Sequence, residues 1–347
     1  MDFSRQCRRF QNFRLLNEDT FRRQLTNIAA ISTFKNASKT STQYRIVLAD
    51  NDERMLLIVN ESDGALLKEL HIDYETYGIC CTSKPNNNFI YVSDYTNGCV
   101  RKYDETLNEL VKLTMPDKLA PMRSPCQLAI NSELELIQVV DQMNCRLVCF
   151  DLNTDAYASD FRLFDDDLTK VTKFSPPNRV DLSKHMSLDE HHGHVKRLAA
   201  LDFWPFGLFS KNERVFVTDW NRGFLYVYKN GVLERKIGNV VNTFDGSNTS
   251  TPVSNYNGKL FLKPRDIIID SLDSILVADT EQNALVLLDH KGVYQFQTKL
   301  PKIKSAHAKD RSMMSYNSNG IYGLSRIENN KLLIATNSSI IICNLTN

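Results

Sequence analysis

The chain has 347 residues, of which 42% are hydrophobic and 24% are charged, and its formal net charge is +1. This length exceeds that of a typical compact domain, so we expect either two domains or one large repeat fold. The near-neutral charge excludes a protein built around bulk attraction to phosphate, so any nucleic-acid site would be a local patch. No apolar run is long enough to span a membrane, and the N-terminal residues lack the apolar core of a secretory signal.

Five apolar hairpins follow one another along the chain with the same internal spacing. Each has an Asp at the end of its first apolar run and an aliphatic residue six positions after that Asp. They are RIVLADNDERMLLIVN (45–60), FIYVSDYTNGCVRKYD (89–104), LIQVVDQMNCRLVCFD (136–151), RVFVTDWNRGFLYVYK (214–229) and ILVADTEQNALVLLD (275–289). A sixth copy, KLLIATNSSIIICNL (331–345), has Thr336 in place of the Asp. Because a carboxylate accepts hydrogen bonds from turn N–H groups, we interpret Asp50, Asp94, Asp141, Asp219 and Asp279 as turn formers.

Two further runs accompany most of the hairpins. A short apolar run precedes each one, at residues 27–33, 77–83, 125–131, 205–210, 264–270 and 321–327. A more polar run follows five of them, at residues 66–72, 109–115, 158–164, 232–238 and 293–300. The repeating unit is therefore a four-stranded antiparallel meander. One such sheet cannot bury both of its faces, but six arranged radially can, which predicts an all-β fold, a six-bladed β-propeller.

The last unit lacks a fourth strand, and the start of the chain offers one. The segment RQCRRFQNFRLL (5–16) is strand-like and is not needed by the first unit. If it pairs as the outer strand of the last blade, it closes the ring and removes an exposed sheet edge. We therefore expect a single domain over residues 1–347, with the closing strand and lead-in at 1–26 and a long insertion between blades at 165–204.

The stretch KPRDIIIDSLDSILVADTEQNALVLLDHKG (263–292) resembles an NHL repeat. It has that family's Pro, its apolar-V-A-D run and its final Asp-x-x-Gly, and Asn97 and Asn144 occupy the family's Asn position in two other copies. Arg222 and Gln282 stand at that position in two more copies, and the chain has only 13 glycines. The resemblance, over about residues 27–345, is therefore to a divergent member, and it implies a six-bladed propeller like those of tripartite-motif/NHL proteins. The alternative is the extracellular six-bladed propeller with YWTD repeats, which VFVTDW resembles.

The long connections between units indicate where a ligand would bind. They lie at residues 116–124, 165–204, 240–263 and 301–320, and in a blade meander such connections emerge on the same face as the second-to-third-strand hairpins. We call this the insertion-bearing face and expect binding there. Cations interleaved with aromatic side chains suit a partner surface or a nucleic-acid strand. The candidate binding residues are Arg54, Tyr95, Arg146, Trp220, Arg222, Lys302, Lys304 and Arg311.

Metal, cofactor and redox chemistry are not expected. The His-rich stretch KHMSLDEHHGH contains His185, His191, His192 and His194, which are weak metal candidates because their spacing fits no defined zinc scaffold. The eight cysteines form no C-x-x-C pair, which favours reduced thiols and a cytoplasmic location.

The function expected from these features is non-catalytic recognition of a protein or peptide by a monomeric scaffold propeller. The chain has no P-loop, no G-x-S-x-G turn and no dinucleotide fingerprint. Ubiquitin-ligase activity would need a RING segment, which this sequence does not contain. The alternative is a single-stranded RNA-binding propeller of post-transcriptional regulation, which the resemblance to tripartite-motif propellers permits.

Overall fold

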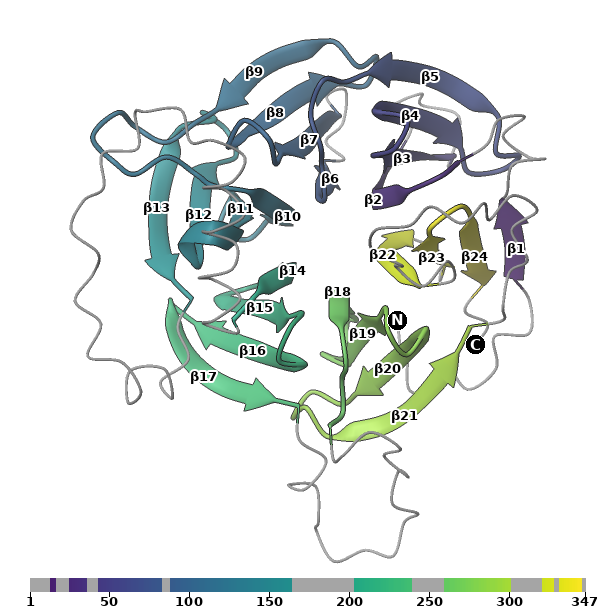
Figure 1. Cartoon of the computed structure of the whole chain (residues 1–347), viewed down its shortest axis with the longest axis vertical. Helices are drawn as coiled ribbons and strands as arrows, with labels where there is room; N and C mark the ends of the chain where they lie inside the picture. The colour runs from purple at the N-terminus through teal and green to yellow at the C-terminus, as the bar shows by residue number, and fades with distance from the viewer. Residues whose placement is uncertain are drawn as a thin grey trace, which may run out of the picture.

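The computed structural model describes residues 13–16, 25–35, 43–82, 88–163, 203–238, 259–300, 320–327 and 331–344. These residues form six four-stranded antiparallel sheets arranged around a central axis (Figure 1). In each sheet the first strand lies next to the axis and the fourth lies at the rim. The predicted six-bladed β-propeller is therefore confirmed.

The strands have the following bounds. Blade 1 contains β2 (Ile28–Lys35), β3 (Tyr44–Asp50), β4 (Met55–Asn60) and β5 (Leu66–His71). Blade 2 contains β6 (Ile79–Cys81), β7 (Phe89–Asp94), β8 (Cys99–Asp104) and β9 (Glu109–Leu113). Blade 3 contains β10 (Pro125–Asn131), β11 (Leu136–Asp141), the 3-10 turn η1 (Gln142–Asn144), β12 (Arg146–Asp151) and β13 (Tyr157–Arg162).

Blade 4 contains β14 (Pro205–Lys211), β15 (Arg214–Asp219), β16 (Phe224–Lys229) and β17 (Val232–Ile237). Blade 5 contains β18 (Pro264–Ile269), β19 (Ile275–Asp279), β20 (Ala284–Leu288) and β21 (Tyr294–Lys299). Blade 6 contains β22 (Ile321–Ile327), β23 (Lys331–Thr336), β24 (Ile340–Asn344) and, as its outer strand, β1 (Phe13–Leu16).

The ring is closed by the N-terminal strand, as the sequence predicted. Strand β1 pairs with β24 in antiparallel register, from Phe13 opposite Cys343 to Leu16 opposite Ile340. The side chain of Leu16 is only 1% exposed and belongs to the apolar cluster between blades 6 and 1. The expected strand covered residues 5–16, and its first part lies outside the described residues.

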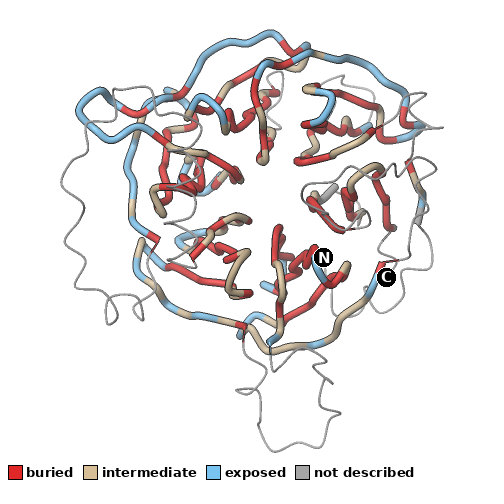
Figure 2. Tube along the Cα trace, in the orientation of Figure 1, coloured by how far each residue is buried: buried red, intermediate tan, exposed pale blue. Residues whose placement is uncertain are grey.

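The core lies between neighbouring blades, because each sheet presents apolar side chains on both faces. One cluster, for example, joins Phe216 and Val227 of blade 4 to Ile267 and Val277 of blade 5. The second and third strands are buried almost throughout, whereas the outer strands are mostly exposed or half-buried (Figure 2). This explains why the two middle strands appear in the sequence as continuous apolar runs and the fourth run is more polar.

Glycines allow the first strands to approach one another near the axis. A Cβ atom on Gly78 would lie 2.2 Å from the carbonyl oxygen of Cys126 in the next blade. A Cβ on Gly207 would lie 2.2 Å from the carbonyl oxygen of Arg265. Both distances are far below any real contact, so these two positions require the absence of a side chain.

Candidate functional site

The insertion-bearing face is assembled by one hydrogen-bonding arrangement around the repeated Asp. In blade 4, Asp219 accepts the N–H groups of Asn221 and Arg222 at its own hairpin tip, each at 3.1 Å. It also accepts the N–H of Trp204, in the segment that enters the blade, at 3.1 Å. Asp50 and Asp279 make the same double connection, and Asp141 makes it with the side-chain amide of Asn144 as the donor at the tip. Each Asp is thus a turn former, and it also fixes the inter-blade segment beside the hairpin tip.

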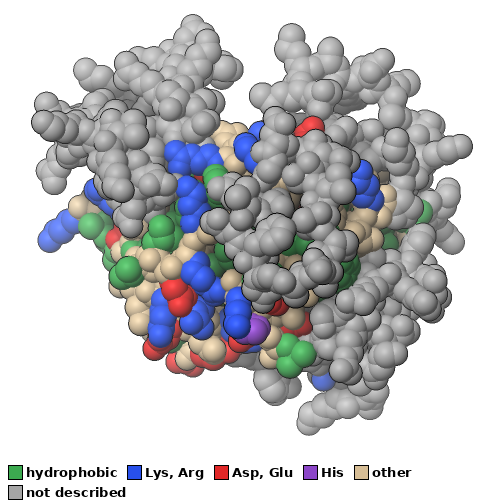
Figure 3. All heavy atoms as spheres, turned by 90° about the horizontal axis from the view of Figure 1, so that it is seen from below, with side chains coloured by type: hydrophobic (Ala, Val, Ile, Leu, Met, Phe, Trp, Pro, Cys, Tyr) green, Lys and Arg blue, Asp and Glu red, His purple; other side chains and the backbone are tan. Residues whose placement is uncertain are grey.

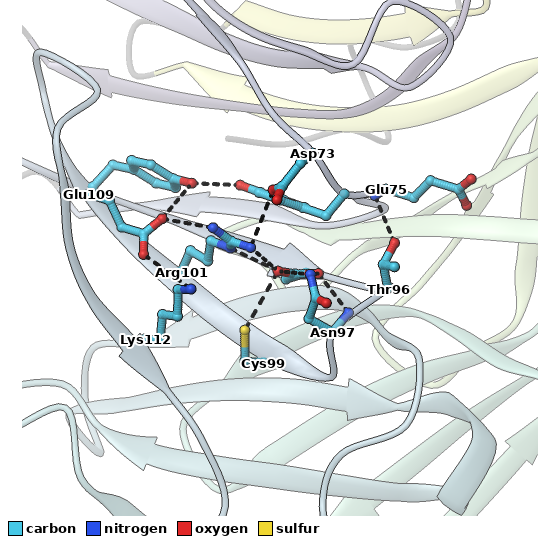
Figure 4. Close-up of polar contacts among 11 residues, drawn as sticks. Asp73, Glu75, Thr96, Asn97, Cys99, Arg101, Glu109 and Lys112 are labelled. Carbon is cyan, nitrogen blue, oxygen red and sulfur yellow. Dashed lines mark hydrogen bonds and ion pairs between the residues drawn. The ribbon is translucent and has the colours of Figure 1, made fainter. Parts of the chain in front are cut away.

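Blade 2 reaches the same result with different partners (Figure 4). Asp94 accepts the N–H of Asn97 and the Nε–H of Arg101, both at 2.8 Å. The inter-blade segment is held instead by Thr96, whose hydroxyl accepts the N–H of Glu75 at 3.1 Å. Here a guanidinium takes the place of the backbone donors of the inter-blade segment, so Arg101 has a structural role.

Arg146, a candidate binding residue, lies inside the hairpin tip of blade 3 instead of on its surface. Its Nε lies 2.7 Å from the carboxylate of Asp141, and its Nη1 lies 2.9 Å from that of Asp160. Its Nη2 donates to the carbonyl of Ala120 at 2.7 Å. Burial raises the pKa of Asp141, and the hydrogen bonds from Asn144 and the nearby guanidinium oppose that rise. The guanidinium therefore serves to keep a buried carboxylate charged.

Arg54 and Tyr95 lie at the tips of blades 1 and 2. The Nη2 of Arg54 lies 3.3 Å from the carboxylate of Glu75, and both side chains are 39% exposed. The ring of Tyr95 packs edge-on against that of Tyr77, with 4.9 Å between the ring centroids. These two candidates remain accessible, but each already has a partner within the protein.

The tip of blade 4 brings together both tryptophans of the chain, Trp204 and Trp220. The N–H of Trp220 donates to the carbonyl of Trp204 at 2.9 Å, and both residues are half-buried. The Nζ of Lys263, from the next inter-blade segment, lies 4.1 Å from the centroid of the Trp220 ring and 3.4 Å from the side-chain oxygen of Asn221. The Nε of Arg222 lies 3.9 Å from Asp219. We call Trp204, Trp220, Asn221, Arg222 and Lys263 the tryptophan patch.

The sequence interpretation missed Trp204 and Lys263, although a signal for Trp204 was present. Trp204 precedes the first strand of blade 4, and Asp219 was already recognised as a turn former. Bonding of that Asp to the preceding segment brings Trp204 beside Trp220. Lys263 carried no comparable signal, because its place over Trp220 depends on how blade 5 packs against blade 4.

A second group, also missed, surrounds the axis. The guanidinium of Arg265, in β18, lies 4.7 Å from the ring of Phe206, 4.6 Å from that of Tyr322 and 5.9 Å from that of Tyr77. It donates to the carbonyl of Tyr322 at 3.0 Å and to that of Ala29 across the ring at 3.4 Å. We call Tyr77, Phe206, Arg265 and Tyr322 the axial cluster. In three first-strand segments an aromatic residue is followed by Gly (YG, FG and YG). This repeated pair was the sequence signal that could have predicted an aromatic cluster near the axis.

Below the axial cluster, a buried carboxylate connects three blades. Asp266 accepts the N–H of Leu324 at 2.7 Å, that of Ile267 at 2.8 Å and the side-chain amide of Gln127 at 3.0 Å. Burial raises the pKa of Asp266, and these hydrogen bonds lower it in part. The polar groups near the axis therefore hold the ring together.

The remaining candidates lie outside the described residues. They are Lys302, Lys304 and Arg311, and the weak metal candidates His185, His191, His192 and His194. Within the described ranges, no group of three or more His, Cys, Asp or Glu side chains could hold a metal ion. Those ranges also contain no helix with the length and hydropathy needed to cross a membrane.

On the face drawn in Figure 3, Lys and Arg side chains lie near Asp and Glu side chains. The outer strand of blade 4 carries charges of both signs. Arg214 is paired with Glu234 at 2.9 Å, and the guanidinium of Arg235 donates to the carbonyl of His290 in blade 5 at 3.2 Å. The Nζ of Lys236 lies 4.3 Å from the ring of Phe224. Because these charges are of both signs and are partly paired, the rim is a mixed surface and not a basic stripe.

No protein-family model and no curated protein sequence matches this chain. Solved structures match it in fold. A streptogramin B lyase has a TM-score of 0.53 at 9% identity, with 96% of this chain and 98% of that chain covered. A virginiamycin B lyase from Staphylococcus aureus has a TM-score of 0.52 at 10% identity, with 96% and 99% covered. The β-propeller domain of Cps50 (Swd1) from Myceliophteria thermophila has a TM-score of 0.52 at 10% identity, with 92% and 84% covered. At these identities the similarity shows the propeller fold alone.

Proposed function

We propose that this chain is a non-catalytic recognition platform that binds a protein or peptide through its insertion-bearing face. The observation that carries the proposal is the tryptophan patch. Trp220, on the hairpin tip, and Trp204, in the segment that enters the blade, are both half-buried, and a backbone hydrogen bond and Asp219 hold the segment to the tip. Large aromatic side chains on a pre-organised support are the usual energetic centres of protein interfaces, because they bury much area at low entropic cost.

Several features support recognition over catalysis. The lyases among the structural neighbours are only 9% and 10% identical to this chain, so their chemistry is not carried over. The residues nearest the axis support the ring: Arg265 donates to backbone carbonyls of other blades, and Asp266 accepts hydrogen bonds from Gln127 and Leu324 in two other blades. A monomeric, cytoplasmic scaffold related to the NHL propellers is part of the same proposal.

Single-stranded RNA is the second candidate ligand. In its favour, a cation lies over an indole at the tip of blade 4, where Lys263 Nζ is 4.1 Å from the Trp220 ring centroid. Such a pair resembles the stacking and phosphate-binding elements of single-strand binders. Against it, Arg54 and Arg146 are paired with carboxylates of the protein itself.

The test compares the wild-type chain with Trp220→Ala. A displayed peptide library is selected on each immobilised protein, and thermal melts establish that both are folded. We expect the wild type to enrich peptide families that Trp220→Ala fails to retain, with an affinity loss of about 2 kcal/mol or more for those peptides. Equal enrichment on both proteins would place the binding elsewhere and remove the observation on which the proposal rests.

The RNA alternative has its own measurement. Binding of a single-stranded oligouridylate is followed at low and at physiological salt, for the wild type and for Lys302→Ala/Lys304→Ala. If RNA is the ligand, the double variant should flatten the salt dependence by about one unit of log–log slope per lost phosphate contact. Absence of binding below about micromolar Kd at physiological salt would eliminate RNA.

A further inference from the structure

We infer that the tryptophan patch recognises an acidic segment of its partner, with an apolar side chain of that segment against the indoles. This inference rests on the proposed function and names the chemical class of the partner. It follows from how charge is distributed over the described residues of the insertion-bearing face.

Blades 4 and 5 present cations at this end of the molecule. Lys263 lies over Trp220, and Lys259 is exposed at the start of the segment that leads to Lys263. Arg222, on the same hairpin tip as Trp220, is 17% exposed and lies 3.9 Å from Asp219. Among the described residues of these hairpin tips and inter-blade segments, Glu281 is the one acidic residue that is exposed. Within the described part of the chain, an anionic ligand would therefore meet more cations than carboxylates around the indoles.

Blades 1 and 2 carry the opposite charge on the same face. Asp52 and Glu53 are exposed at the tip of blade 1, and the side chain of Asp73, before blade 2, is 82% exposed. Glu75 is 39% exposed and pairs with Arg54. A ligand with carboxylates would be repelled from these two blades and attracted to blades 4 and 5, which determines both where it binds and how it is oriented.

The aromatic component of the patch favours a peptide with a hydrophobic anchor over a purely ionic ligand. Lys263 already contacts Trp220 and Asn221, so its ammonium group is placed beside the indole before any ligand arrives. A carboxylate that approaches this ammonium would bring its neighbouring side chain onto the half-buried indoles. The few cations of the patch would suit the carboxylates of a short segment better than a long series of phosphates.

Intrinsic fluorescence provides a direct test, because the chain has two tryptophans and both lie in the patch. Three synthetic peptides of the same length are titrated into the full chain. Each contains glycine and one central Phe, together with Glu, Gln or Lys at the remaining positions. We expect a saturable change of tryptophan emission with the Glu peptide and much weaker binding of the other two. Trp204→Phe and Trp220→Phe, each with one remaining indole, identify which residue reports.

Charge-reversal variants locate the effect. Lys263→Glu should weaken binding of the Glu peptide about tenfold or more, because an attraction becomes a repulsion. Its matched control is Lys68→Glu, the same change on the exposed outer strand of blade 1, which should leave the affinity within about twofold. Thermal melts of both variants verify that they are folded. The backbone N–H of Lys263 donates to Asp279, so a change of the Lys263 side chain leaves this hydrogen bond intact.

The possible results separate this inference from the proposed function. Equal or tighter binding of the Gln or Lys peptide would overturn the acidic class and leave a peptide-binding platform. Binding of the Glu peptide that is insensitive to Lys263→Glu would overturn the site. If oligouridylate binds in a Lys263-dependent manner while no peptide changes the emission, both the inference and the proposed protein-binding function fail.

Discussion

Arg146 and Trp220 were expected to play the same part, and their surroundings give them different ones. Arg146 is 10% exposed and lies between the carboxylates of Asp141 and Asp160. Trp220 is half-buried at the surface of its hairpin tip, beside Lys263. A cation near a turn can bind a ligand only where carboxylates of the protein do not already neutralise it. In blade 3, Asp141 and Asp160 neutralise Arg146.

Replacement of Arg146 by Met should therefore destabilise the fold. The variant leaves the carboxylate of Asp141, whose side chain is fully buried, without its guanidinium partner. The expected loss is about 3–5 kcal/mol of unfolding free energy, measured by urea denaturation at neutral pH. The matched variant Arg54→Met breaks a half-exposed pair with Glu75 and should cost about 1 kcal/mol or less. Similar losses in the two variants would show that the Arg146 pair is no more than a surface ion pair.

Each outer strand is a sheet edge and contains at least one charged residue. Lys68, Lys112, Lys236 and Lys299 lie on β5, β9, β17 and β21. A charged side chain on an edge strand opposes pairing with another molecule. Blade 6 differs in origin, because its outer strand comes from the opposite end of the chain.

Loss of β1 should lower the stability more than loss of the residues before it. Deletion of residues 1–16 removes Leu16 from the apolar cluster between blades 6 and 1 and leaves β24 as an unpaired edge. Burial of one leucine alone accounts for about 2–5 kcal/mol. Deletion of residues 1–12 keeps β1 and is the control. The difference in melting temperature between the two truncations isolates the contribution of β1.

The same pair of truncations tests the role of the sheet edge. An exposed β24 offers unpaired N–H and C=O groups, so the 1–16 deletion should also form soluble aggregates, which sedimentation velocity detects. If both truncated proteins melt at the same temperature and remain equally monodisperse, closure by β1 does not stabilise the ring.

Across the whole propeller, close packing between the blades buries or half-buries the seven described thiols, of which Cys81 and Cys145 are the half-buried ones. Burial raises the pKa of Cys81, Cys126, Cys145 and Cys343 to about 12, and that of Cys99 and Cys149 to about 11. The pKa of these thiols in the folded state exceeds their value of about 8.5 in the unfolded state. Their contribution to the free energy of unfolding is therefore fully present below about pH 8.5. Their contribution is lost as the pH rises through about 9 toward 12. The unfolding free energy in urea should therefore fall over this alkaline range.

Thiol alkylation measures the same enclosure. All eight thiols should react in denaturant without prior reduction, because we expect no structural disulfide. In the native protein at mildly alkaline pH, the buried thiols should react far more slowly, since little thiolate forms. The count of modified cysteines by mass spectrometry checks both statements. Thiols that become reactive only after addition of a reductant would indicate disulfides and favour the extracellular type of propeller.

The propeller architecture could be predicted from local sequence patterns. Hairpin strands pair with their neighbours in the chain, and strands buried on both faces must be apolar throughout, so local patterns were enough to define six blades. The shortage of one strand in the last unit also pointed to the N-terminal segment, and β1 confirms it. The role of the aspartates at the hairpin tips could be predicted for the same reason, because Asp50, Asp94, Asp219 and Asp279 accept backbone N–H groups two or three residues away.

Whether a candidate residue lies at the surface or in the interior depends on how the blades pack together. The partners of Arg146 include Asp160 on the next strand and a carbonyl in the long inter-blade segment. Lys263 lies over Trp220 because blade 5 packs against blade 4, and Arg265 contacts Tyr77 and Tyr322 because the ring is closed. These contacts join segments that are far apart in the chain. The energies of these contacts depend on distances between blades that no local sequence pattern encodes. The tryptophan patch and the axial cluster could therefore be identified only from the packing of the blades.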